Sequence, residues 1–141
     1  MRGYPQPLNG EIDGPIGRDP RNRQRMAVVA AGREAHTRYR TLERLKGWTL
    51  VEARPATGRT HQIRVHFAYL GHSIAGDSTY GGRTPLVTRQ FLHAAGLQFR
   101  HPISGKSVSF TSTLPDDLRR ALAELGSQWR ELIPSSPAAE D

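Results

Sequence analysis

Residues 58–71 read GRTHQIRVHFAYLG, and this stretch holds the start, the body and the end of a predicted helix. Thr60 is expected to be the N-cap, because a threonine hydroxyl can accept a hydrogen bond from a free amide of the first turn. Ile63, Phe67 and Leu70 follow at spacings of i, i+4 and i+7, which places them on one helical face. Gly71 supplies the stop, since glycine readily adopts the left-handed conformation that ends many helices. The pattern predicts a helix over about residues 61–70.

The stretches on either side of this helix predict antiparallel strands. Thr37, Tyr39 and Thr41 alternate with arginines, and the run 48–53 follows after a break, so these two segments predict a β-hairpin. Residues 76–82 read GDSTYGG, which is typical of a turn. Residues 91–99 and 107–111 predict two further strands joined by a turn.

The two ends of the chain predict different structures. The first 25 residues contain eight glycines and prolines, so we expect residues 1–34 to be an extended arm or loop without a regular element of any length. Near the other end, a helix is expected from about Asp116, and its apolar residues share one face: Leu118, Ala121, Leu122, Leu125. A short helical turn is expected to hold Trp129, Leu132 and Ile133, and residues 135–141 are expected to be a disordered tail.

Composition points to one basic domain that binds a polyanion. The 141 residues carry a net charge of +7, and all of the 20 bases except Lys46 and Lys106 are arginines, whose guanidinium groups bind phosphate in a bidentate manner. From Arg54 to Arg100 there are six arginines and a single acid, Asp77. The alternative is that the arginines reflect a general compositional bias. The chain has no cysteine and no apolar run long enough to cross a bilayer, so we expect a cytoplasmic protein without disulfides, thiol nucleophiles or membrane contact.

Several side chains are candidates for a functional site. Arg59 and Arg64 flank a helix N-terminus, whose free amides attract anions. Asp77 among arginines stays ionised, as a nucleophile should, but the same segment also fits an ordinary turn in which Asp77 caps local amides, and we favour the turn. Tyr80 can stack on a base or simply pack. The six histidines do not share metal-binding spacing, so no metal site is expected, and His93 is assigned a structural or phosphate contact.

Taken together, the motifs resemble the RluA-type RNA pseudouridine synthases. The resemblance covers about residues 1–125 and rests on segments in a matching order: 12–20, 32–39, 58–66, 76–82, and Leu92-His93-Ala94 with the residues up to Pro102. It implies a mixed α+β fold with a curved, largely antiparallel sheet, flanking helices and an RNA-binding cleft. It also implies the reaction: a uridine is flipped out of rRNA or tRNA, its glycosidic bond is broken, and the base is rejoined through C5, without metal or cofactor.

The resemblance also implies roles for individual residues. The arginine that matches Arg64 pairs with the catalytic carboxylate in this family, and the leucine that matches Leu92 lines the uracil pocket. The remaining residues that we expect to bind substrate belong to the same motifs: Arg59, Thr60, His61, Gln62, Asp77, Tyr80, His93.

One family feature is not present in the sequence. Family members carry a His-Arg-Leu-Asp segment whose aspartate is the essential catalyst, and the 141 residues contain no such segment. Residues 1–134 are therefore expected to be the C-terminal portion of a catalytic domain, whose partner is the N-terminal half of the same domain. Arg64 is expected to lack its carboxylate partner. A fragment, a mispredicted start and a degenerate remnant remain open, and the alternative function is a non-catalytic RNA-binding module.

Overall fold

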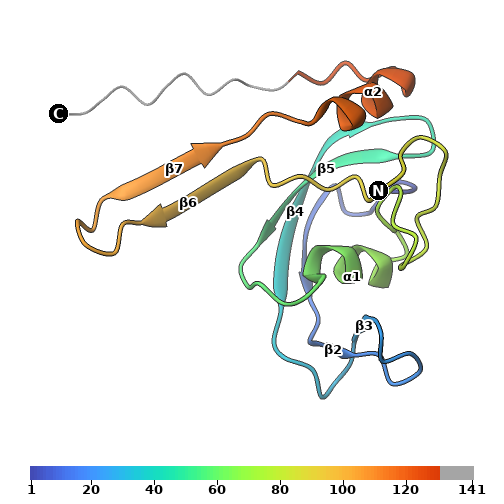
Figure 1. The fold of residues 1–141 in the computed structure, drawn as a ribbon. Coiled ribbons are helices and arrows are strands. Elements are labelled where there is room, and N and C mark those ends of the chain that lie inside the picture. Colours follow the sequence, from blue (N-terminus) through green and yellow to red (C-terminus); the bar gives the residue numbers. More distant parts are fainter. Residues whose placement is uncertain (131–141) are drawn as a thin grey trace.

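The computed structural model describes residues 1–130, which form a mixed α+β fold built from antiparallel sheets (Figure 1). The elements follow in the order β1 (Asn9–Asp13), β2 (Ile16–Arg18), β3 (Met26–Val28), β4 (His36–Arg44), β5 (Thr49–Pro55), α1 (Gln62–Tyr69), β6 (Gly96–Arg100), β7 (Ser107–Thr111), α2 (Asp116–Glu124). Three sheets result: β1-β4-β5, β2-β3 and β6-β7. The predicted α+β class is confirmed. Leu132, Ile133 and the tail 135–141 lie outside the described residues.

The N-terminal segment is more ordered than the sequence predicted, so the expectation of an arm without regular elements was wrong. β1 pairs with β4 over five residues, and β2 pairs with β3. The glycines and prolines limit the strands to short lengths but do not prevent them. Gly10 even assists the pairing, because a Cβ at this position would lie 2.8 Å from the ring of Tyr39. Ile12 and Ile16 consequently reach the core, where they are 3% and 2% exposed.

The predicted hairpin and helix form the centre of the molecule. β4 and β5 pair as expected, with a bulge between Thr41 and Glu43. The helix forms over Gln62–Tyr69, and Gly71 follows it with a φ of +84°, as predicted. The face of the helix was only partly predicted: Phe67 is buried, but Leu70 is 37% exposed. Instead His66 is fully buried, because its ring bonds to Thr37 Oγ1 at 2.8 Å and to the carbonyl oxygen of Gly14 at 2.9 Å.

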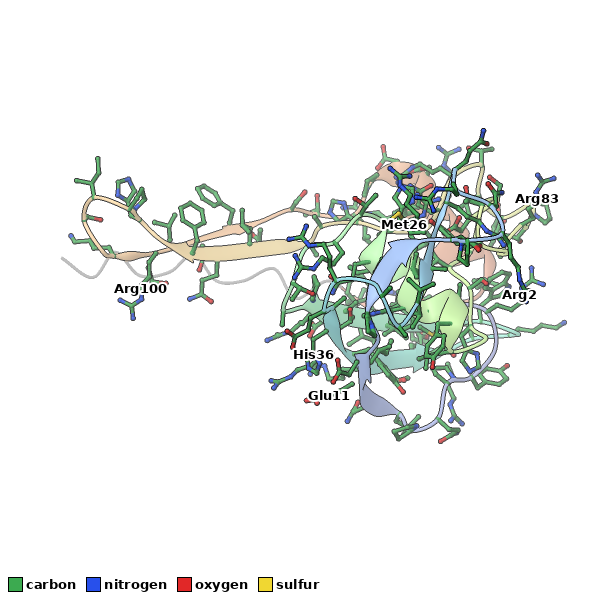
Figure 2. The ribbon with its side chains drawn as sticks, turned by 90° about the horizontal axis from the view of Figure 1, so that it is seen from below. Arg2, Glu11, Met26, His36, Arg83 and Arg100 are labelled. Atoms are coloured by element: carbon green, nitrogen blue, oxygen red, sulfur yellow. The ribbon has the colours of Figure 1, made fainter. Side chains whose placement is uncertain are left out.

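The C-terminal part consists of a projecting hairpin and a helix packed on the body. β6 and β7 pair antiparallel, but β6 begins at Gly96 and not near Phe91, and the ribbon extends away from the body (Figure 1). Figure 2 shows the same from a perpendicular direction, with Arg100 far from Met26 and His36. In α2, Leu118, Ala121 and Leu122 are buried as predicted. The segment after α2 is not helical over residues 127–130. No helix within residues 1–130 is long and apolar enough to cross a membrane.

Candidate functional site

The loop between β5 and α1 is held in place by the side chain of Gln62. Its Oε1 accepts hydrogen bonds from the Thr57 hydroxyl at 2.7 Å and from the Arg59 amide at 3.1 Å. Its Nε2 donates to the carbonyl oxygen of His36 at 3.0 Å and to Thr37 Oγ1 at 2.9 Å. Gln62, expected to bind substrate, thus has both ends of its amide bonded within the protein.

Thr60 is not the N-cap of α1, contrary to the sequence prediction. The N-cap is His61, which has a φ of +54° and no side-chain capping bond. A positive φ is unfavourable for a residue with a Cβ and is often found at functional positions. Thr60 is instead exposed. This conformation could not be predicted from the local sequence, because threonine is a better capping residue than histidine.

Arg64 has a carboxylate partner, so the expectation that it would lack one was wrong. Its Nε donates to Asp77 Oδ2 at 2.9 Å and its Nη2 to Asp77 Oδ1 at 3.0 Å, a bidentate pair. The Asp77 side chain is 0% exposed and the Arg64 side chain 14%. Asp77 Oδ1 also accepts the amides of Thr79 and Tyr80, each at 3.2 Å. The favoured turn role of Asp77 is therefore confirmed, and the ion pair adds to it.

The Tyr80 ring packs against the guanidinium group of Arg64. The Arg64 guanidinium lies 5.2 Å from the centre of the Tyr80 ring, within the range of a cation–π contact. The Tyr80 hydroxyl accepts the amide of Met26 at 3.0 Å and lies 3.0 Å from His61 Nδ1. The hydroxyl donates to Nδ1 in the tautomer of neutral His61 that carries its proton on Nε2.

The charges of these groups reinforce one another. Burial raises the pKa of Asp77, but the hydrogen bonds and charge of Arg64, with the two amides, outweigh burial and lower it. The hydrogen bonds that Arg64 donates to Asp77 raise the pKa of Arg64. Burial, with the charges of Arg64 and Arg18, lowers the pKa of His61, and the charge of Asp77 only partly opposes this. At neutral pH the site therefore holds an ion pair beside an uncharged imidazole.

A pocket of about 420 Å³ lies beside Arg64 and His61, between β5, α1 and the segment before β6. Five of the predicted site residues line it: Arg59, His61, Gln62, Arg64, Leu92. Asp77 and Tyr80 contact Arg64 but do not line the pocket, and His93 instead bonds to the carbonyl oxygen of Ser112 at 3.1 Å. The remaining lining residues were not predicted as site residues from the sequence: Pro55, Thr57, Gly58, Ile63, Gln90. Within residues 1–130 no cluster of His, Asp and Glu side chains is arranged to hold a metal ion.

The buried ion pair predicts a loss of stability in acid. Because the folded-state pKa of Asp77 lies below its ordinary value of 3.8, its contribution to the free energy of unfolding is complete above about pH 4 and is lost as the pH falls through the folded-state pKa. We expect Asp77→Asn to cost about 2 kcal/mol at neutral pH, because Arg64 loses the charge of its partner and one of its two acceptor oxygens. Urea unfolding between pH 3 and pH 7 measures both effects. A variant whose stability falls below pH 4 as steeply as the wild type contradicts the prediction.

Comparison with known proteins identifies the family. The family described as RNA pseudouridylate synthase matches residues 4–69. An uncharacterised RNA pseudouridine synthase of Chloroflexus aurantiacus is 53% identical over 121 residues, which cover 84% of this chain and 38% of the relative. Ribosomal large subunit pseudouridine synthase D of Zymomonas mobilis is 45% identical over 128 residues, which cover 83% of this chain and 40% of the relative.

Structural comparison indicates the same family as the sequence matches. The structure of human RNA pseudouridylate synthase domain containing 1 superposes with a TM-score of 0.71 at 32% identity, covering 81% of this chain and 51% of that chain. The class is thus that of the pseudouridine synthases, which are isomerases. The chain belongs to the RluA-type family of RNA pseudouridine synthases, as the motifs predicted. It spans about two fifths of the length of the curated relatives quoted above.

Proposed function

We propose that residues 1–134 are the C-terminal portion of a pseudouridine synthase catalytic domain, which binds RNA and contributes Arg64 to the site of uridine isomerisation. The pocket supports this proposal most directly, because it combines two arginines, Arg59 and Arg64, with the apolar side chain of Leu92. Arginines bind phosphate, and an apolar wall suits a flipped base. The substrate is rRNA or tRNA, and the name of the Zymomonas mobilis relative favours rRNA. A cytoplasmic location follows from such a substrate.

A second group of arginines supports RNA binding next to the pocket. Arg18 ends β2, and the loop between β2 and β3 carries Arg21, Arg23 and Arg25. This loop lies beyond α1 at the end of the body opposite α2 (Figure 1). Asp19 organises the loop, because it accepts the Arg21 amide at 2.9 Å and Arg25 Nε at 2.8 Å. A loop with a fixed shape holds its arginines apart at a low entropic cost, which favours contacts with successive phosphates.

The catalytic carboxylate is proposed to come from a polypeptide with a His-Arg-Leu-Asp segment. Asp77 is a poor candidate for that role, because both of its oxygens already accept hydrogen bonds from Arg64. With its carboxylate supplied in this way, the site performs the reaction of the family. Without such a polypeptide, the chain is a non-catalytic RNA-binding module, which is the second candidate function.

The projecting hairpin is a suitable docking surface for that polypeptide. Leu97 pairs with Phe110 and Phe99 with Val108, so these four side chains share one face of the ribbon. Leu97, Phe99 and Phe110 are 61%, 42% and 58% exposed. The other face is polar and carries Gln98, Arg100, Ser107, Ser109. An isolated two-stranded hairpin is marginally stable, so a partner with an apolar face would stabilise it.

RNA binding is expected to depend strongly on salt and on the two pocket arginines. Each phosphate neutralised by an arginine releases a counterion, so the affinity falls as salt rises. We expect Arg59→Ala with Arg64→Ala to weaken binding to a uridine-containing RNA stem-loop about tenfold and to reduce the salt slope by about 1 to 2. Fluorescence anisotropy at several salt concentrations measures both quantities.

The matched control is Arg38→Ala with Arg40→Ala, which removes the same charge from the opposite face of β4. Arg38 and Arg40 alternate with the buried Thr37 and Tyr39, and they pair with Glu11 and Glu52. We expect this control to bind RNA within about threefold of the wild type, since neither arginine lines the pocket and both lie on the exposed face of β4. A salt-independent affinity, or equal losses for the two double variants, would contradict the proposed function.

A further inference from the structure

The hydrogen bonds of Arg64 occupy only one edge of its guanidinium. Nε and Nη2 face Asp77, whereas Nη1 makes no hydrogen bond to any of the residues that the structure describes. One face of the group is covered by the Tyr80 ring. A guanidinium has five N–H donors in a fixed plane, so fixing one edge fixes the direction of the others. Arg64 also lines the pocket, so the remaining donors are available to a group bound there.

The side chains that hold Arg64 are themselves fixed. The Asp77 carboxylate is completely buried and accepts two amides of its own turn in addition to Arg64. Tyr80 is tied to β3 through the Met26 amide. Arg64 therefore has little freedom to rotate away from its partner. A surface arginine without such a frame would lose rotamer entropy each time it bound an oxyanion.

We propose that Asp77 is a positioning residue, which holds Arg64 so that its Nη1 edge meets the catalytic carboxylate. The inference rests on the proposed function, which assigns that carboxylate to Arg64. In this arrangement Asp77 takes no part in bond making. It sets the direction of a charge that acts on the reacting groups, and such preorganised charges contribute strongly to rate. Loss of Asp77 then lowers the rate of the chemical step more than it lowers RNA affinity.

A second ion pair provides the matched control. Arg89 donates Nε to Asp117 Oδ2 at 2.9 Å and Nη2 to Asp117 Oδ1 at 3.1 Å, the same geometry as Arg64 with Asp77. Asp117 lies on α2, outside the pocket, and its side chain is 42% exposed. Asp117→Asn thus breaks an equivalent bidentate pair that has no proposed role in the reaction.

The first measurement uses the chain alone and is independent of catalysis. In ¹⁵N–¹H spectra, the Arg64 Nε–H proton should be protected from solvent exchange, because its acceptor is completely buried. We expect Asp77→Asn to remove this protection, whereas Asp117→Asn should leave the Arg64 signal unchanged. An Arg64 signal that stays protected in Asp77→Asn overturns the proposal, whatever the outcome of the activity assays.

The second measurement uses the chain combined with a polypeptide that contains the His-Arg-Leu-Asp segment. Asp77→Asn should lower kcat about tenfold or more, while KM for RNA changes by less than about threefold. In an Arg64→Lys background Asp77→Asn should have no further effect, because the group that it positions has been replaced. The proposal is overturned if Asp77→Asn lowers kcat by the same factor in the Arg64→Lys background as in the wild type. It is also overturned if Asp117→Asn lowers kcat as much as Asp77→Asn.

Two further outcomes also test the proposal. If Asp77→Asn does not fold, the activity of Arg64→Lys tests it instead. Lysine keeps the charge beside Asp77 but cannot reach two carboxylates in fixed directions. Full activity of Arg64→Lys overturns the proposal. If the combined chains bind RNA and show no turnover at all, the proposed function fails, and the exchange measurement still decides whether Asp77 holds Arg64.

Discussion

Gly76→Ala is expected to destabilise the chain by about 4 kcal/mol, which is most of the free energy of unfolding of a domain at the low end of the ordinary range of about 5–15 kcal/mol. Gly76 has a φ of +78°, and a Cβ at this position would lie 2.0 Å from the carbonyl oxygen of Arg89 and 2.6 Å from Val87 Cγ2. A side chain at positive φ costs about 1 kcal/mol or more, and the overlap with backbone adds about 1–3 kcal/mol. Gly76 directly precedes Asp77, so its substitution also displaces the partner of Arg64.

Gly71→Ala is the matched control for this prediction. Gly71 has a similar φ of +84°, but a Cβ there would have nothing within 4 Å. It therefore bears only the conformational cost, about 1 kcal/mol. Urea unfolding of the two variants compares the losses directly. Equal losses would mean that the turn can move away from Arg89 at little cost, contrary to the geometry described above.

Local patterns in the sequence predicted the elements that surround the site. The alternation around Tyr39, the helical spacing of Ile63 and Phe67, and the position of Gly71 all reflect contacts within a few residues. Such contacts are encoded by periodicity and by glycine conformation, so the β4–β5 hairpin and α1 could be predicted well. The turn over residues 76–82 was predicted for the same reason.

Features that depend on distant residues were predicted poorly. The pairing of β1 with β4 joins Ile12 to Thr37, and no local signal announces it among the glycines and prolines. Thr60 satisfies every local rule for an N-cap, yet Gln62 is held by the carbonyl oxygen of His36 and by Thr37 Oγ1 on β4, and the helix begins one residue later than this cap requires. Tertiary contacts outweigh capping propensity at this position.

The ion pair of Arg64 combines a local feature that could be predicted with a distant contact that could not. The sequence indicated that Asp77 was the only acid among six arginines and that it belonged to a turn. It did not reveal that α1 brings Arg64 against that turn, because a turn motif describes only its own backbone. The family resemblance drew attention to a different partner for Arg64. The two interpretations are compatible, since a guanidinium has enough donors for two carboxylates.

The largest expected effect is on catalysis: the chain alone should not isomerise uridine, and turnover should appear when a His-Arg-Leu-Asp polypeptide is added. Asp77 is engaged by Arg64 on both oxygens and is 0% exposed, so it cannot approach a ribose without breaking a buried pair. An added carboxylate near Arg64 would instead stay ionised, because the guanidinium lowers its pKa.

Tritium release from RNA labelled at uridine C5 measures this turnover for the chain alone, for the mixture with a polypeptide that contains the His-Arg-Leu-Asp segment, and for mixtures with variants. Arg64→Ala should abolish the gain, whereas Arg89→Ala, which removes a bidentate arginine outside the pocket, should retain it. Phe99→Ser with Phe110→Ser should weaken the association, since both side chains lie on the exposed apolar face. Turnover by the chain alone that disappears in Asp77→Asn would instead make Asp77 the nucleophile, and the assignment of Arg64 to a second carboxylate would then be wrong.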